Sequence, residues 1–367
     1  MTVTQLTLEE FRNYARLSLS LSPGVNVIYG ENAQGKTNLL EAVGYLSAAS
    51  SHRARYDREL IRFGAGHACI SAELLAYGRE FTLTARLHRG ARRQLFSNGV
   101  RLKTAGELSG ILTTVFFCPE DLYLIREGAA VRRRFLDGCI CQLRPRYGEA
   151  LAEYRRLYEH KTRILRDCGT KPSLLDALEE FNVRMAQVGA VLIHYRAHFI
   201  KRLREVTPEI HRDFSGGREE LDLSYATVKT IPDPQAPAKE LLPFLLEHQR
   251  SHYQAELESR QCLSGPHKDD LQVFIDQVSA KSFASQGQTR TAALSLKLAC
   301  REILYQETGE WPVLLLDDVL SELDERRREY VLRRITGGQV LITCCEDVGP
   351  AALEKGSVFH IRGGALV

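Results

Sequence analysis

The sequence predicts an α/β fold in which a lobe of strands and helices is interrupted by a helical insertion. Three observations predict it. Apolar, β-branched segments typical of strands stand near the start of the chain, at 3–8, 17–21 and 25–29. Long helical patterns then fill about 126–260. Strand and helix patterns alternate again after Leu271, so an α/β lobe begins, is interrupted and is completed.

The first part of the lobe, predicted at 1–125, is mixed α/β. A helix is expected from Thr37, because TNLLEAVGYLSAAS places leucines and a valine on one helical face. Further strands are expected at 68–75, 80–88 and 94–102, the last around an Asn98-Gly99 hairpin turn.

The insertion, predicted at 126–260, contains a connector at 231–238 whose three prolines exclude a regular helix. The second part of the lobe is predicted at 261–367. Its expected elements are a strand at 271–275, a helix at 289–307, a buried strand at 313–316, a helix at 322–334 and a strand at 339–343.

The 367-residue composition indicates a packed, soluble protein, with 44% hydrophobic and 26% charged residues. The net charge of +3 excludes a basic-tail protein and leaves room for a local basic face. No apolar run approaches the roughly 20 residues that a bilayer requires, and Glu9 and Glu10 stand where a signal peptide would have its apolar core. We therefore expect a cytoplasmic protein with no membrane partner.

The segment Gly30–Thr37 matches the phosphate-loop pattern G-x-x-x-x-G-K-[ST] in full, after a predicted strand and before a predicted helix. Glycines let backbone N–H groups surround phosphate oxygens, and the helix that follows presents its positive end. Lys36 would neutralise the β- and γ-phosphates, and Thr37 would ligate Mg²⁺. This segment predicts binding of a nucleoside triphosphate with Mg²⁺.

Two carboxylates follow the buried run 313–316. This pattern is typical of a central parallel strand whose carboxyl end faces a ligand. Asp317 is placed to hold Mg²⁺ through water. Asp318 would point the other way along the strand and could orient or deprotonate the attacking water. The alternative is a surface strand end capped by acids, which the upstream phosphate loop disfavours.

Two Ser-x-x patterns allow two interpretations. Ser285-Gln-Gly-Gln288 fits a capping box at the start of a helix. The same serine, glycine and helix end could form a second anion site, which would serve the nucleotide of another chain. Ser321-Glu-Leu-Asp324 is equally compatible with a helix cap.

These motifs occur in the order and spacing of the ATP-binding-cassette (ABC) ATPases of chromosome maintenance and repair, the SMC, Rad50 and RecF group. Six further stretches resemble the bacterial RecF family: LEEFRNY (8–14), SHR (51–53), FCPEDL (117–122), VRRRFLD (131–137), SGPHKDDL (264–271) and SFASQGQTRTAALSLKLA (282–299). The resemblance extends from end to end. It implies an α/β ABC-type P-loop ATPase head (mixed sheet with an antiparallel β subdomain) interrupted by a mainly helical arm domain.

The resemblance also implies a function, namely an ATP-dependent DNA-binding recombination and repair protein with slow, DNA-stimulated ATPase activity. The implied partners are DNA (single-stranded, duplex or gapped), a second copy of the chain in an ATP-dependent head-to-tail homodimer, and RecR, with RecO and RecA in the pathway.

The resemblance assigns roles to motif positions. ATP would be bound by Gly30, Glu31, Asn32, Ala33, Gln34, Gly35, Lys36, Thr37 and Asn38, with Gln288. Lys36, Asp318 and Ser285 would be catalytic, with Ser285 reaching the γ-phosphate from the partner subunit. Thr37 and Asp317 would serve Mg²⁺, and Asp324 would lie at the dimer seam.

Two departures from general ABC ATPases predict slow hydrolysis. Asp318 stands where transporters have a glutamate, and a base one methylene shorter must reach further. Thr343-Cys344-Cys345 replaces the expected histidine, which removes a γ-phosphate contact. No glutamine of the usual ABC loop occurs at 117–121, and the sequence leaves open whether Glu120 substitutes for it.

DNA contacts would be made mainly to phosphates, by arginine. Two arginine clusters are candidates: Arg53, Arg55 and Arg58, and Arg132, Arg133 and Arg134. Solvated faces are the ordinary alternative. His267, Asp269 and Asp270 resemble a metal or acid–base cluster, although a turn stabilised by caps or salt bridges is the commoner outcome.

Two other functions are less compatible with the sequence. A structural DNA tether of the SMC and Rad50 type with ATP gating would need long arms, and a hairpin of the insertion gives arms of about 100 Å at most. The motor subunit of a transporter is disfavoured because the insertion is larger than such subunits usually carry.

Overall fold

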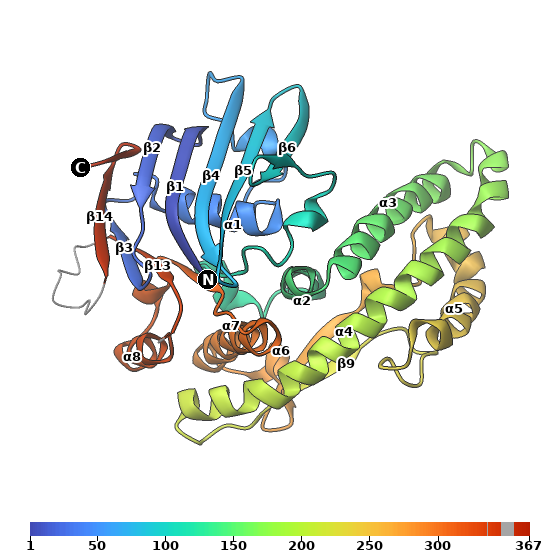
Figure 1. Cartoon of the computed structure of the whole chain (residues 1–367). Coiled ribbons are helices and arrows are strands. Elements are labelled where there is room, and N and C mark those ends of the chain that lie inside the picture. The colour runs from blue at the N-terminus through green and yellow to red at the C-terminus, as the bar shows by residue number, and fades with distance from the viewer. Residues whose placement is uncertain (336, 346–355) are drawn as a thin grey trace. The chain divides into compact units, whose positions relative to one another are not determined.

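The computed structural model describes residues 1–335, 337–345 and 356–367 (Figure 1). It divides into two compact units, one formed by Met1–Tyr123 with Ala293–Val367 and the other by Leu124–Ala292. The predicted boundary at 260/261 passes through a sheet of the second unit, because the strands on either side of it pair with each other. The α/β class with a mainly helical insertion is confirmed.

The first unit contains a six-stranded antiparallel sheet of order β2-β1-β4-β5-β6-β7. Its strands are β1 (Thr2–Phe11), β2 (Tyr14–Ser20), β4 (His67–Ala76), β5 (Arg79–His88), β6 (Ala91–Ser97) and β7 (Val100–Arg101). The hairpin predicted at Asn98-Gly99 joins the last two strands, and both of its residues have positive φ. This sheet is the antiparallel β subdomain that the family resemblance implied.

The second sheet of this unit has the order β15-β14-β3-β13-β12-β8 and is parallel except for the terminal β14–β15 hairpin. Its strands are β3 (Val25–Tyr29), β8 (Thr114–Phe117), β12 (Val313–Asp317), β13 (Val340–Cys344), β14 (Ser357–Arg362) and β15 (Ala365–Leu366). Strands β3 and β12, from opposite ends of the chain, both flank β13. The carboxyl ends of these strands therefore meet at one edge, as the rule for ligand sites in parallel sheets requires.

Helix α1 (Lys36–Ala48) packs between the two sheets (Figure 1). Its apolar face, which includes Leu39, Leu40, Val43 and Leu46, is fully buried in one core with residues of both sheets. This burial fixes the start of α1, and with it the preceding loop, against the ends of the parallel strands.

Shorter elements complete the first unit: η1 (Asp57–Glu59), η2 (Ala105–Leu108), η3 (Pro119–Tyr123), η6 (Val319–Glu322) and α8 (Glu325–Arg334). The helix predicted at 322–334 begins at Glu325, because the Asp324 side chain accepts a hydrogen bond from the backbone N–H of Arg327 and caps it. Ser321 does not form that cap, since its hydroxyl donates to the Asp318 carbonyl.

The second unit is mainly helical. Its helices are α2 (Ala129–Leu143), α3 (Pro145–Asp167), η4 (Pro172–Ala177), α4 (Leu178–Ser215), α5 (Ala238–Ser259), η5 (Pro266–Lys268) and α6 (Ala280–Phe283). Helix α4 packs against both α3 and α5. The unit also contains a small sheet of order β11-β10-β9. Its strands are β9 (Leu221–Ala226), β10 (Asp270–Ile275) and β11 (Val278–Ser279). Helix α7 (Gln286–Thr308) begins in this unit and continues into the first.

None of the described helices is both long enough and apolar enough to cross a bilayer.

Candidate functional site: a phosphate loop beside two carboxylates

The predicted phosphate loop joins β3 to α1 in the first unit, and its two glycines are sterically required. Gly30 and Gly35 have φ values of +151° and +115°. A Cβ on Gly30 would lie 2.3 Å from the carbonyl oxygen of Ile361, and one on Gly35 would lie 2.5 Å from Nδ2 of Asn13. The motif glycines therefore permit both the backbone turn and the close packing around it.

Lys36 extends its buried side chain back along the loop. Its Nζ donates to the carbonyl oxygens of Gly30 at 2.6 Å and Glu31 at 3.1 Å, and lies 3.8 Å from Sγ of Cys345. No carboxylate in the described part of the chain forms an ion pair with it. The ammonium is thus held at the loop with its charge unneutralised, as phosphate binding requires.

The loop is also held from outside by the turn between β1 and β2. Asn13 Nδ2 donates to the carbonyl oxygen of Gln34 at 2.8 Å, and its Oδ1 accepts from Asn38 Nδ2 at 2.8 Å. The Tyr14 hydroxyl donates to the carbonyl oxygen of Gly35 at 3.0 Å. These contacts give a structural role to the LEEFRNY stretch, whose sequence alone indicated only a family resemblance.

The terminal hairpin β14–β15 supplies a second brace. The backbone N–H of Gly363 donates to Oε1 of Gln34 at 2.6 Å, and that of Gly364 donates to the Gln34 carbonyl at 3.1 Å. The loop conformation is therefore fixed by contacts from the first and the last strands of the unit.

Asp317 ends β12 and lies beside the phosphate loop. Its Oδ1 accepts hydrogen bonds from the hydroxyls of Thr37 at 2.8 Å and Thr343 at 2.9 Å. Burial raises the pKa of Asp317, and the two hydroxyl bonds only partly oppose that effect. A carboxylate touching the phosphate-loop threonine is the donor set that Mg²⁺ takes beside nucleotide phosphates, so these residues fit the ion.

Asp318 does not continue the strand as the sequence predicted. Its backbone is left-handed, with φ +49°, and it begins the short helix η6. Its N–H donates to the Thr343 hydroxyl at 2.8 Å, whereas its buried Oδ1 has no hydrogen-bond partner among the described residues. A buried carboxylate oxygen without a partner requires one from outside the chain, such as water.

Asp318 and the phosphate loop line one pocket of about 220 Å³. The pocket-lining residues are Asn32, Ala33, Gly35, Lys36, Thr37, Asn38, Arg53 and Asp318. The structure thus brings together the predicted lysine, threonine and base. It adds Arg53, a candidate DNA contact in the sequence, whose Nη1 lies 3.5 Å from Oδ1 of Asn38. The SHR stretch drew attention to Arg53, but no sequence pattern indicated that Arg53 lies beside the phosphate loop.

Ser285 and Gln288 lie in the second unit and form both bonds of a capping box. Gln288 Oε1 accepts from the N–H of Ser285 at 2.8 Å, and Ser285 Oγ accepts from the N–H of Gln288 at 3.2 Å. The capping interpretation is therefore confirmed. The Ser285 hydroxyl hydrogen is not used by the cap, so the second interpretation is compatible with it. Phe283, two residues earlier, is 77% exposed.

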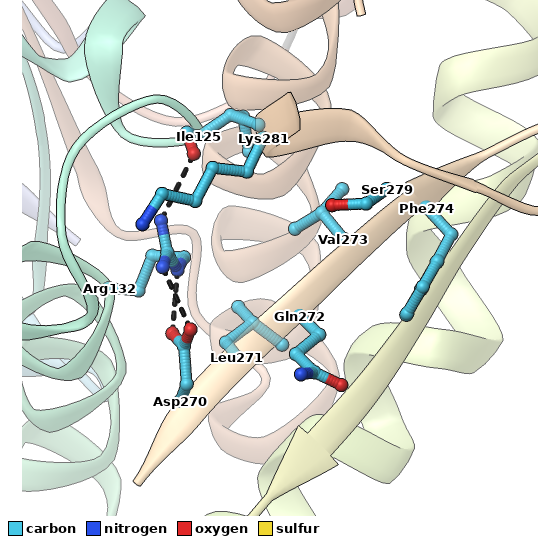
Figure 2. Close-up of a pocket in the computed structure, with 9 residues that line it drawn as sticks. All are labelled: Ile125, Arg132, Asp270, Leu271, Gln272, Val273, Phe274, Ser279 and Lys281. Atoms are coloured by element: carbon cyan, nitrogen blue, oxygen red, sulfur yellow. Dashed lines mark hydrogen bonds and ion pairs between the residues drawn. The ribbon is translucent and has the colours of Figure 1, made fainter. Parts of the chain in front are cut away.

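The interpretation of Arg132 as a DNA contact is wrong. Arg132 is 2% exposed, and its Nε and Nη2 donate to the two carboxylate oxygens of Asp270 at 2.7 and 2.8 Å. Its Nη1 donates to three backbone carbonyls, including that of Ile125 (Figure 2). Arg133 is half-buried and donates to the Asp269 carbonyl at 2.6 Å. Only Arg134 of this cluster is exposed.

Asp269 belongs to a buried ionic network, as the commoner interpretation of GPHKDDL predicted. It is 1% exposed, forms an ion pair with Arg196 at 2.9 Å, and accepts hydrogen bonds from the hydroxyls of Tyr225 and Thr227. Asp270 pairs with Arg132. No group of three or more metal-ligating side chains occurs within 1–335, 337–345 and 356–367.

No residue of the segment 117–121 lines the phosphate-loop pocket, so no contact identifies a substitute for the missing glutamine. Glu120 is exposed, whereas the neighbouring Asp121 forms an ion pair with Lys297 at 2.8 Å.

Comparison with known proteins agrees with this architecture. The family model described as "RecF/RecN/SMC N terminal domain" matches residues 2–355. The DNA replication and repair protein RecF of Clostridium perfringens strain SM101 is 36% identical over 100% of this chain and 99% of its own. That of Acetivibrio thermocellus is 38% identical over 94% of both chains.

Solved structures give the same result. The recombination mediator protein RecF-ATPrS in the RecFOR pathway superposes with a TM-score of 0.92 at 32% identity, covering 100% of this chain and 97% of that one. The Smc head domain of Pyrococcus furiosus has a TM-score of 0.56 at 16% identity, covering 99% and 94%, and shares the fold alone. The ABC-type ATPase head with a helical arm is therefore confirmed, and the chain belongs to the RecF family within the RecF, RecN and SMC group.

Proposed function

We propose that this protein is an ATP-dependent DNA-binding protein of DNA replication, recombination and repair, in which slow ATP hydrolysis controls a head-to-tail homodimer. The observation that supports this proposal most strongly is one pocket lined by Lys36, Thr37, Arg53 and Asp318, whose Oδ1 has no hydrogen-bond partner among the described residues. Two relatives with known structures are named as RecF with ATP or ATPrS, which agrees with a triphosphate in this pocket.

Each pocket residue has a distinct task. The loop 30–38 would surround the phosphates with backbone N–H groups, and Lys36 would neutralise their charge. Arg53 would supply a second cation at the pocket wall, in place of the DNA contact predicted from sequence. Thr37 and Asp317 would hold Mg²⁺, which supplies charge neutralisation at the phosphate oxygens when bound.

Asp318 would accept the proton of the attacking water through Oδ1, to which no residue in the described part of the chain forms a hydrogen bond. An aspartate reaches one methylene less far than a glutamate, so the water is held less closely to the ideal distance and hydrolysis is slow. Slow hydrolysis suits a switch, because the ATP-bound state then lasts long enough to act on DNA.

Ser285 and Gln288 would complete the pocket of a second copy of the chain. The Ser285 hydroxyl hydrogen and the start of helix α7 are suited to a γ-phosphate. Phe283 is 77% exposed beside this turn, and a partner subunit would cover it. ATP would then join two chains because each supplies part of the site, with Asp324 at the seam.

DNA binding would use Arg55 and Arg58 in the first unit. Their guanidinium carbons lie 5.4 and 4.7 Å from the centre of the Tyr56 ring, which is 47% exposed. Neither arginine forms an ion pair in the described part of the chain, so both charges are available to phosphates. The name RecFOR pathway, given for related structures, supports RecR and RecO as partners, with RecA downstream.

A long-armed tether is disfavoured. The longest described helix, α4, has 38 residues and spans only about 57 Å at 1.5 Å per residue. It packs along α3 and α5 in a compact unit instead of extending as a free coiled coil.

Size-exclusion chromatography with light scattering tests the proposal. Wild-type protein is expected to be monomeric without nucleotide and dimeric with ATP and Mg²⁺. Lys36→Met should remain monomeric, whereas Lys171→Met, which removes an exposed lysine, should dimerise normally. Binding to gapped, duplex and single-stranded DNA with and without ATP should then show tighter binding in the ATP state. If adding ATP and Mg²⁺ changes the oligomeric state of neither wild type nor Lys36→Met, the proposal is contradicted.

A further inference from the structure

We propose that Thr343 is a positioning residue for hydrolysis, which holds the backbone of Asp318 in its left-handed conformation and ties it to Asp317. This inference rests on the proposed ATPase function. It concerns a residue of the segment Thr343-Cys344-Cys345, which stands in place of the histidine of general ABC ATPases.

Strand pairing places Thr343 at the two carboxylates. In the parallel register of β12 with β13, Thr343 lies opposite Asp317. Thr343 is 1% exposed and does not line the phosphate-loop pocket. Its contacts with the site are therefore made through other residues, not directly with a nucleotide.

The Thr343 hydroxyl forms two bonds of opposite polarity. It donates to Oδ1 of Asp317 at 2.9 Å and accepts from the backbone N–H of Asp318 at 2.8 Å. A hydroxyl has one hydrogen and two lone pairs, so it can satisfy an acceptor and a donor at the same time. Valine, which has the same shape, can satisfy neither.

The second of these bonds fixes an unfavourable conformation. A non-glycine residue at φ +49° has its Cβ close to backbone atoms, and such conformations persist only where neighbours enforce them. The Asp318 N–H would be unpaired without Thr343, and the turn into η6 would lose its first anchor. The other anchor of the turn is the bond from the Ser321 hydroxyl to the Asp318 carbonyl at 2.6 Å.

The orientation of the base follows from this turn. Asp318 leaves the strand in the left-handed region and lines the same pocket as Lys36, and its Oδ1 has no hydrogen-bond partner within the described ranges. A relaxed turn would move that oxygen relative to bound phosphate. Small displacements of a base reduce the rate strongly, whereas the loop and lysine that bind ATP are unaffected.

The experiment compares Thr343→Val, Thr343→Ala and Thr343→Ser in the full chain with Mg²⁺, ATP and DNA. Val is expected to lower kcat roughly 10-fold with the KM for ATP changed less than about twofold. Ser should retain the wild-type kcat, while Ala, which differs from Ser only by the hydroxyl oxygen, should behave as Val. If Thr343→Val does not fold, the comparison of Thr343→Ser with Thr343→Ala provides the test.

Two further readouts separate positioning from general damage. Affinity for a non-hydrolysable ATP analogue and the fraction of analogue-bound dimer should match wild type in all three variants. Thr207→Val is the matched control, because Thr207 is fully buried and its hydroxyl has no partner in the described part of the chain. It should leave kcat unchanged.

A wild-type kcat in Thr343→Val, or a loss of analogue affinity equal to the loss of kcat, would overturn the inference alone. A wild-type protein that binds no nucleotide would overturn the proposed function as well, so the two failures are distinguishable.

Discussion

The hydroxyl of Thr37 donates a 2.8 Å hydrogen bond to Oδ1 of Asp317, although 280 residues separate them in the chain. The two residues meet because β3 and β12 both flank β13 in one parallel sheet. The threonine that follows the phosphate-loop lysine and the carboxylate at the strand end are thus already assembled within the first unit. This contact needs neither the second unit nor a second chain.

Asp317→Asn is expected to separate nucleotide binding from Mg²⁺-dependent hydrolysis. Asparagine keeps an oxygen that can accept from Thr37 and Thr343, so the local fold should persist. If Asp317 helps to hold Mg²⁺ as proposed, the lost charge should weaken the metal site, and kcat should fall about 100-fold or more. Steady-state ATPase assays across a Mg²⁺ titration measure this effect.

Nucleotide affinity in the presence of EDTA should be the same for Asp317→Asn and wild type. A variant that hydrolyses ATP at the wild-type rate at every Mg²⁺ concentration would show that Asp317 is not part of the metal site.

Sequence patterns predicted the candidate site residues that local signals in the chain mark. The loop 30–37 and the carboxylates at 317 and 318 were found because glycine spacing and a buried strand end are local signals. Arg132 was misassigned because its partner, Asp270, lies 138 residues later. No local pattern distinguishes an exposed arginine from one that a distant carboxylate will bury.

The same limit explains the errors in the fold. Strand β9 was missed inside the helical insertion because its pairing partner β10 follows the whole of α5. The extended conformation predicted for Asp318 was wrong because the backbone N–H of Asp318 donates to the hydroxyl of Thr343, which belongs to another strand. Tertiary contacts override the alternation expected of a strand.

Arg12→Met is expected to destabilise the first unit by about 3 kcal/mol, because it leaves a buried charge unpaired. Arg12 donates through Nε and Nη2 to both oxygens of Glu41, whose side chain is fully buried. Burial acts to raise the pKa of Glu41, but bonds from Arg12 and Ser51 outweigh it and hold the pKa below its ordinary value. Urea unfolding at pH 7 measures the loss.

The double variant Arg12→Met/Glu41→Leu should recover most of this stability, since no charge then remains buried. Equal destabilisation of the single and double variants would show that packing, not the unpaired carboxylate, causes the loss.

Arg55→Ala/Arg58→Ala should weaken DNA binding in a salt-dependent way. If each arginine contacts one duplex phosphate, the slope of log K against log salt concentration should become shallower by about 1.8. Fluorescence anisotropy over a salt series measures the slope. The control Arg79→Ala/Arg101→Ala removes two exposed arginines of the same unit and should leave it unchanged. Equal slopes for wild type and Arg55→Ala/Arg58→Ala would place the DNA surface elsewhere.

His267 should make the second unit sensitive to acid. Burial, as the main cause, lowers the pKa of His267 to about 4. Three nearby cations act in the same direction: Lys268, Lys161 and Arg133. Nε2 lies 3.0 Å from the Cys262 carbonyl, which can only accept, so Nε2 carries the hydrogen. Nδ1 then accepts from the Tyr154 hydroxyl at 2.9 Å, and the neutral ring satisfies both contacts.

The sign of the pH dependence follows from this lowered pKa. Between pH 6.5 and about 4 the unfolded chain binds a proton at His267 that the folded chain does not, so stability falls as the pH falls. The full shift corresponds to about 3 kcal/mol. Urea midpoints from pH 7 to 4 should therefore decline less steeply in His267→Gln than in wild type, even if the variant starts lower. His198→Gln, at an exposed histidine of α4, should keep the wild-type slope. Parallel slopes for His267→Gln and wild type would mean that other groups control the acid response.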